Sequence, residues 1–144
     1  MNREPAKQHP GSSTGPKTIL VVDDDDDVRE LLRHYLEDLG YSVRDASGGQ
    51  QALDRAFENG RAIDLLLTDV HMPRMGGGEL AAVMAERIPN VRVILISADA
   101  PDSVVCGPLV RSGLRFIQKP LSLADLASQI RAELDAREVA AQRV

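Results

Sequence analysis

A short apolar run that ends on an acid constrains this chain more than any other feature. Leu65 to Leu67 is too short for a helix and does not alternate with polar residues, which indicates a central parallel strand covered on both faces. Asp69 then stands at the carboxyl end of that strand, and Pro73 with the glycines at 76–78 favours a loop before the next helix. Because ligands bind at this edge of open α/β sheets, Asp69 is a candidate nucleophile. An isolated Asp after a strand is also typical of a turn or a cap. The residues that follow the other predicted strands are needed to distinguish a nucleophile from a turn or cap residue.

Strand and helix patterns alternate along the rest of the chain. Apolar segments predict four further strands, which are Thr18–Val22, Tyr41–Asp45, Val91–Ser97 and Leu114–Gln118. Apolar residues at helical spacing predict helices after the first, second, third and fifth strands, over Val28 to Leu39, Ala52 to Phe57, Leu80 to Ile88 and Leu123 to Leu134. Asn59 and Gly60 are interpreted as the end of the second helix. Such alternation forms βαβ units, so we predict an α/β domain with a five-stranded doubly wound parallel sheet and helices on both faces.

The segment from Ala98 to Gly113 has the weakest helical pattern. Proline and glycine interrupt it at four places, Pro101, Gly107, Pro108 and Gly113. A proline inside a helix costs about 3 kcal/mol and a glycine about 1 kcal/mol more. We therefore expect a short turn of helix at most, or a mobile loop, rather than a continuous helix from Asp102 to Arg111.

Length and composition predict a single domain. A chain of 144 residues, 43% of them hydrophobic, is long enough for one packed core and too short for two ordinary ones. The first residues combine Pro, Gly, Ser and charges with no apolar periodicity, so they bury too little surface to offset the entropy of ordering. We expect a disordered leader or linker at residues 1–17, the domain at 18–137 and a C-terminal tail at 138–144.

The charge balance and the single cysteine exclude several classes of function. A net charge of −5 with 3% aromatic residues argues against direct nucleic-acid binding. Cys106 has no partner for an internal disulfide, and the sequence shows no signal segment or long apolar span for a membrane. These features predict a soluble, cytoplasmic protein.

Polar side chains follow four of the predicted strands. Asp23 and Asp24 follow the first, Asp69 the third, Ser97 the fourth and Lys119 the fifth. The carboxyl ends of parallel strands lie on one edge of a sheet, so we expect these groups to converge. Carboxylates at close range repel one another unless a cation lies between them, and oxygen ligands of this kind suit Mg²⁺. With a lysine and a hydroxyl nearby, the set is suited to phosphoryl transfer.

Several short motifs occur in one order between Thr18 and Leu134: Val-Val-Asp23-Asp24, Leu-Leu-Thr-Asp69-Val-His71-Met-Pro73-Arg-Met-Gly-Gly77, Ile-Ser97-Ala98 and Phe116-Ile-Gln-Lys119-Pro120. Together they resemble the receiver domain of two-component response regulators. The resemblance implies a flavodoxin-like sheet with strand order 2-1-3-4-5. It also implies that the chain is not a classical enzyme, although it catalyses its own phosphorylation and dephosphorylation.

The resemblance implies specific roles for the acidic residues. Asp69 would accept a phosphoryl group from a histidine of a sensor histidine kinase or of a histidine phosphotransfer protein. Asp23, Asp24, Asp69 and the backbone carbonyl of His71 would hold Mg²⁺. The later acids Asp25 to Asp27 are interpreted as helix first-turn residues, which the helix dipole favours.

The resemblance also implies a switch. Lys119 and Ser97 would grip the phosphoryl oxygens, Ser97 and Phe116 stand at switch positions, and the Lys119-Pro120 bond is similar to one that is usually cis. Phosphorylation would change a surface that a downstream protein recognises. Because Ser97 directly precedes the segment from Ala98 to Gly113 and Phe116 lies on the next predicted strand, we expect phosphorylation to order that segment.

Two alternatives stay open at this point. One is an Mg²⁺-dependent phosphatase of small molecules with an Asp nucleophile, which is disfavoured because His71 stands where such enzymes carry a second aspartate. The other concerns context: the domain is either a free-standing regulator or a receiver cut from a longer chain such as a hybrid kinase. The sequence does not choose between these last two.

Overall fold

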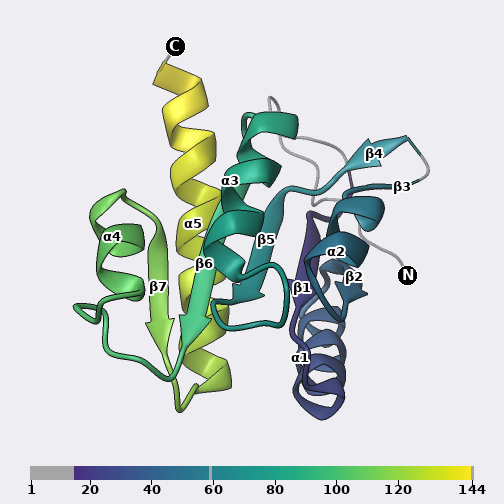
Figure 1. Ribbon diagram of the computed structural model, residues 1–144. Helices are drawn as coiled ribbons and strands as arrows, with labels where there is room; N and C mark the ends of the chain where they lie inside the picture. The colour runs from purple at the N-terminus through teal and green to yellow at the C-terminus, as the bar shows by residue number, and fades with distance from the viewer. Residues whose placement is uncertain (1–14, 59, 144) are drawn as a thin grey trace.

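A five-stranded parallel sheet forms the centre of the molecule (Figure 1). The structure, a computed structural model, describes residues 15–58 and 60–143, with residues 136–143 described as helical backbone only. The strands lie in the order β2-β1-β5-β6-β7, with bounds Ser42–Ala46, Thr18–Val22, Leu65–Asp69, Arg92–Ser97 and Arg115–Gln118. Since β5, β6 and β7 are the third, fourth and fifth strands of this sheet along the chain, the predicted order 2-1-3-4-5 is confirmed.

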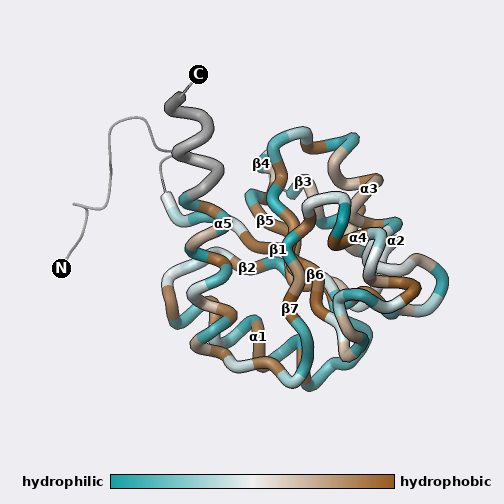
Figure 2. The backbone as a smooth tube through the Cα atoms, turned by 90° about the vertical axis from the view of Figure 1, so that its left-hand side faces the viewer, coloured by the Kyte–Doolittle hydropathy of each residue, from teal (hydrophilic) through white to brown (hydrophobic). Residues whose placement is uncertain are grey.

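Helices cover both faces of the sheet. One layer consists of α1 (Asp26–Asp38) and α5 (Leu123–Arg143), and the other of α2 (Gly49–Arg55), α3 (Gly77–Arg87) and α4 (Cys106–Arg111) (Figure 1). Strand β1 contributes alternate residues to the two apolar cores. The central strands β1 and β5 are buried at every position, and Figure 2 shows hydrophobic residues concentrated along the sheet. Burial on both faces explains why these strands do not alternate in sequence.

The aspartate run begins helix α1. Asp25 is the N-cap, and its side chain accepts hydrogen bonds from the backbone N–H groups of Asp27 and Val28. Asp26 and Asp27 lie in the first turn, where the helix dipole favours negative charge. The interpretation as first-turn residues is therefore confirmed for Asp26 and Asp27, whereas Asp25 lies one position earlier, as the N-cap.

The prediction for the second helix is wrong at its end. Helix α2 stops at Arg55, and Phe57–Glu58 (β3) pairs antiparallel with Arg61–Ala62 (β4) in a separate two-stranded sheet. Phe57 does not join the apolar core; it is 52% exposed. Asn59 lies outside the described residues, and Gly60 has a φ of 73°, which suits a tight hairpin turn.

A single guanidinium explains where helix α2 ends. Arg44 on β2 donates hydrogen bonds to the carbonyls of Arg55, Ala56, Glu58 and Arg61, at distances from 2.9 to 3.3 Å. It satisfies carbonyls that the end of the helix leaves unpaired and holds the hairpin against the sheet. This contact joins segments that are distant in sequence, so the local apolar pattern could not reveal it.

The remaining two helices also bear on the predictions. Helix α4 has only six residues, which confirms that no continuous helix covers Asp102 to Arg111. Pro108 is the third residue of this helix, a position whose N–H would have no partner within the helix. Helix α5 continues to Arg143, through residues 138–143 that the sequence analysis assigned to a tail.

Gly77, at the start of α3, has a position that no side chain fits. A Cβ atom at Gly77 would lie 2.2 Å from the carbonyl oxygen of Asp69. The N–H of Gly77 donates a hydrogen bond to the carbonyl of Val70 at 2.8 Å. The missing side chain lets α3 begin directly against the strand end that carries Asp69. The hydrogen bond and the close approach therefore hold the end of the intervening loop against β5.

We predict that Gly77→Ala lowers the free energy of unfolding by about 1–3 kcal/mol, because the methyl group overlaps backbone that cannot move aside. Urea unfolding measures this loss. Gly48→Ala is the control: a Cβ atom at Gly48 would meet nothing within 4 Å, and its φ of −170° is extended backbone that any residue adopts. This control should cost only about 0.5 kcal/mol, because alanine is a slightly poorer helix N-cap than glycine. Equal losses in both variants would contradict the steric role of Gly77.

Candidate functional site

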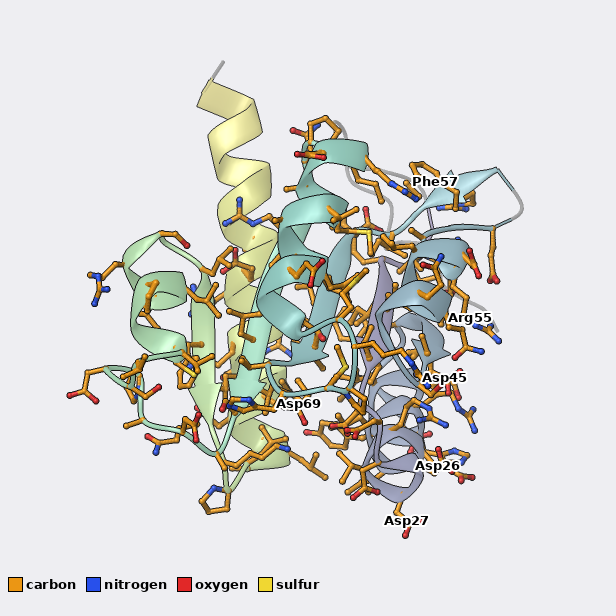
Figure 3. All side chains as sticks on the ribbon, in the orientation of Figure 1. Asp26, Asp27, Asp45, Arg55, Phe57 and Asp69 are labelled. Carbon is orange, nitrogen blue, oxygen red and sulfur yellow. The ribbon has the colours of Figure 1, made fainter. Side chains whose placement is uncertain are left out.

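Three aspartates meet at the carboxyl edge of the sheet. Asp23 and Asp24 follow β1, Asp69 ends the adjacent strand β5, and one oxygen from each lies within 4.8 Å of the others. Asp23 and Asp69 are buried, whereas Asp24 is exposed. Figure 3 shows Asp69 at the end of the sheet toward which the strands point. The structure thus brings together the acids that the sequence analysis expected to converge.

Lys119, which follows the edge strand β7, completes this group at the same edge of the sheet. Its Nζ lies 3.1 Å from Oδ2 of Asp69, and its backbone N–H donates to the carbonyl of Ser97 at 2.8 Å. The other oxygen of Asp69, Oδ1, accepts a hydrogen bond from the backbone N–H of His71 at 3.2 Å. The bond between Lys119 and Pro120 is cis. Both oxygens of Asp69 therefore have a partner.

Ser97 and Phe116 lie on neighbouring strands but in different environments. Ser97 is fully buried, and its Oγ accepts a hydrogen bond from the backbone N–H of Asp99 at 3.0 Å. Phe116 pairs with Leu95 in the sheet and packs, partly buried, against the core under α2, α3 and α4. Only Ser97 belongs to the edge that carries the acids.

The carboxyl group of Asp23 is destabilised in its charged form. Burial raises its pKa, the hydrogen bond from the N–H of Asp25 lowers it, and the charge of Asp69 raises it again, so the net pKa is above the ordinary value. Lys119 brings one positive charge to a group of three carboxylates. Oxygen donors with excess negative charge fit a hard divalent cation such as Mg²⁺.

Three side chains near this group were missed from the sequence, those of His71, Asp99 and Arg29. The imidazole Nε2 of His71 lies 2.6 Å from Oδ2 of Asp99, which joins the loops after β5 and β6. Arg29 contacts the backbone of Asp23 from α1. The only signal in the sequence is position: His71 and Asp99 each stand two residues beyond a predicted site residue, and Arg29 follows the aspartate run.

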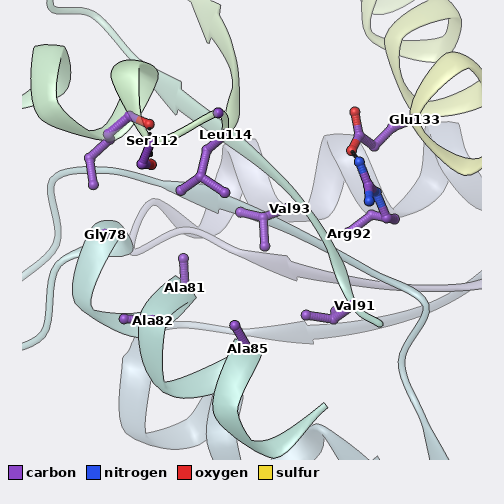
Figure 4. A pocket seen from close by; sticks show the side chains of 12 residues that line it. Gly78, Ala81, Ala82, Ala85, Val91, Arg92, Val93, Ser112, Leu114 and Glu133 are labelled. Atoms are coloured by element: carbon purple, nitrogen blue, oxygen red, sulfur yellow. Dashed lines mark hydrogen bonds and ion pairs between the residues drawn. The ribbon is translucent and has the colours of Figure 1, made fainter. Parts of the chain in front are cut away.

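A groove between α3 and the strands is not part of this site. Figure 4 shows that small or apolar side chains line it, including Ala81, Ala85 and Leu114. Its charged residues Arg92 and Glu133 bind each other in an ion pair. The groove therefore offers no free charged group for phosphoryl chemistry.

Comparison with known proteins identifies the family. The model of the response regulator receiver domain matches residues 19–131, which is most of the chain. The chain belongs to the response regulator receiver family. It is a receiver domain of two-component signal transduction, a family of signalling domains that are generally not enzymes and that bind Mg²⁺ at an acidic pocket.

Individual relatives agree with this assignment. The receiver is similar to the response regulator receiver protein CpdR of Brucella abortus, with 34% identity over 79% of this chain and 93% of that protein. It is also 31% identical to the sensor kinase CckA of the same organism, over 87% of this chain but only 13% of the kinase. A CheY-like receiver structure from Methanospirillum hungatei has a TM-score of 0.77 and 30% identity, covering 86% of this chain and 98% of its own.

The comparisons give no support to the phosphatase alternative. Within the part of the chain that the structure describes, none of the helices has the length and apolar character needed to cross a membrane.

We predict that Asp23→Asn stabilises the metal-free receiver at pH 7. A raised pKa in the folded state means that ionisation of Asp23 costs folding stability as the pH rises above the ordinary aspartate range. Asparagine removes that cost and keeps the oxygen that accepts from Asp25. Thermal unfolding in EDTA should show a higher Tm at pH 7 and a gain that shrinks toward pH 4. Asp54→Asn, an exposed acid on α2, is the control, and an Asp23→Asn gain independent of pH would contradict the account.

Proposed function

We propose that Asp69 is the phosphoacceptor of this receiver. Three features that meet at Asp69 support this role. Asp69 is buried at the end of the central strand, lies beside Asp23 and Asp24, and contacts Lys119. Asp23 and Asp24 lack such a lysine partner among the described contacts. Of the three acids, Asp69 is therefore the one that lies beside both the other carboxylates and Lys119.

The proposed transfer step uses these residues. A carboxylate oxygen of Asp69 attacks the phosphorus of a phosphohistidine, so a P–O bond forms while the P–N bond breaks and the imidazole leaves with its electron pair. Lys119 then holds phosphoryl oxygens that carry the transferred charge. Ser97 also donates a hydrogen bond to the phosphoryl oxygens. Its Oγ accepts from the N–H of Asp99, so its hydroxyl hydrogen is left for this donation.

The residues that would hold Mg²⁺ are Asp23, Asp24, Asp69 and the carbonyl of His71. When bound, the ion neutralises these carboxylates and the incoming phosphoryl oxygens. The buried and disfavoured charge of Asp23 is the feature of this structure that fits such an ion.

We also propose the wider context of the domain. The phosphoryl donor is a histidine of a sensor kinase or of a phosphotransfer protein, and phosphorylation changes a protein-binding surface through Ser97 and Phe116. The functional unit is residues 18–137, in the cytoplasm, with residues 1–17 as leader and 138–144 as tail. A free-standing regulator and a receiver within a hybrid kinase both agree with the relatives CpdR and CckA.

We predict that the full chain takes up one phosphoryl group when it is incubated with acetyl phosphate and Mg²⁺, as measured by intact-protein mass spectrometry. Asp69→Asn should take up none, because asparagine has no nucleophilic carboxylate. Asp102→Asn changes an exposed acid in the loop after β6 and should behave as the wild type. Equal uptake by Asp69→Asn would show that the phosphoacceptor is elsewhere, and multiple turnover of phosphate esters would revive the phosphatase alternative.

A further inference from the structure

Arg29 makes an unusual set of contacts for a surface helix. Its side chain is only 16% exposed, and three of its nitrogen atoms each bind a different residue. Nη1 donates to the backbone carbonyl of Asp23 at 2.8 Å, Nε to Oδ2 of Asp45 at 3.1 Å, and Nη2 to Oδ1 of Asp26 at 2.6 Å. Figure 3 shows Asp26 and Asp45 on the same side of the molecule, near the carboxyl edge of the sheet. Arg29 thus joins the turn after β1, helix α1 and the end of β2.

These contacts fix the backbone of Asp23. Its carbonyl accepts from Arg29, and its N–H donates to the carbonyl of Ala46 at 3.2 Å. Its carboxylate in turn accepts from the N–H of Asp25 at 2.9 Å. Both backbone polar groups and one carboxylate oxygen of Asp23 are therefore tied before any cation is present. Arg29 is the one contact of this set that a side-chain substitution can remove cleanly.

The charge of Arg29 is directed away from the acidic pocket. Asp26 and Asp45 pair with its guanidinium, and the oxygen of Asp23 that it binds belongs to the backbone. Arg29 therefore does not neutralise the carboxylates as Lys119 does. Its effect on them has to pass through the position of Asp23.

We propose that Arg29 is a positioning residue for the divalent-cation site, with Asp45 as its anchor on β2. It holds the turn after β1 so that the carboxylates of Asp23 and Asp24 lie beside Asp69 before the cation arrives. This inference rests on the proposed Mg²⁺ site. Partners that orient metal ligands from behind typically change metal affinity by about 10- to 100-fold, because a loose ligand must be ordered at the moment of binding.

Arg29→Met tests the proposal, since methionine keeps part of the apolar stem and removes all three hydrogen bonds. Mn²⁺ serves as the probe: electron paramagnetic resonance measures free Mn²⁺ in a titration of the full chain, and Mg²⁺ competes for the site. We expect Arg29→Met to weaken Mn²⁺ binding by about 10- to 100-fold. Arg33→Met is the matched control, because Arg33 lies one turn further along α1 and pairs with Glu30 and Glu37 of the same helix. Its affinity should stay at the wild-type value.

Two further variants separate positioning from a loss of folding. Asp45→Ala removes the partner of Arg29 on β2 without changing α1, and it should also weaken Mn²⁺ binding. If Arg29→Met does not fold, Asp45→Ala tests the positioning role in its place. Arg29→Lys can restore a single donor to the carbonyl of Asp23 and should recover part of the affinity. The losses from Arg29→Met and Asp45→Ala should not add in the double variant, because the two residues act through one contact.

The outcomes distinguish this inference from the proposed metal site. If the wild-type chain binds no Mn²⁺, or if Asp69→Asn binds it as tightly, the metal site itself is wrong and the inference fails with it. Suppose instead that the wild type binds Mn²⁺ and Asp69→Asn does not. The metal site then stands, and wild-type affinity in folded Arg29→Met or in Asp45→Ala would overturn only the role of Arg29. An equal loss in Arg33→Met would also overturn it.

Discussion

Repulsion between buried carboxylates at the carboxyl edge of the sheet is the constraint on which the rest of this structure depends. Strands β1 and β5 are adjacent and buried on both faces, so Asp23, which follows β1, and Asp69, which ends β5, have little freedom to move apart. Lys119 relieves part of the repulsion by contact with Asp69, while the charged form of Asp23 stays disfavoured. The fold therefore maintains a site with excess negative charge, and a divalent cation that binds only the folded state would stabilise it.

The two sides of this site are held very differently. On the β1 side, Asp25 caps α1 and Arg29 ties the turn to β2, so the backbone near the acids is fixed. On the β6 side, helix α4 is short, and Val104 in the loop before it is 93% exposed. A fixed backbone suits the binding of a cation, and a short helix behind an exposed loop suits a response to phosphorylation. The hydroxyl of Ser97 lies at the start of that exposed loop.

Much of the fold and of the site could be predicted because local sequence carries the information. Buried parallel strands need apolar runs, and an acid or lysine directly after such a run must lie at the carboxyl edge. The end of the second helix could not be predicted in this way, because Asn59 and Gly60 suit a helix end and a hairpin turn equally well. The choice is made by Arg44, whose guanidinium binds carbonyls from distant parts of the chain. Arg29 escaped notice for the same reason, since its partners meet it only in the folded molecule.

Chemical mapping of the phosphorylated residue tests the central claim most directly. Borohydride reduces an aspartyl phosphate to homoserine, so the chain can be phosphorylated with acetyl phosphate and Mg²⁺, trapped, digested and sequenced by tandem mass spectrometry. The account predicts homoserine at position 69, with Asp23 and Asp24 unmodified. Homoserine at position 23 or 24 with Asp69 unchanged, or a stable phosphate ester on Ser97, would contradict it.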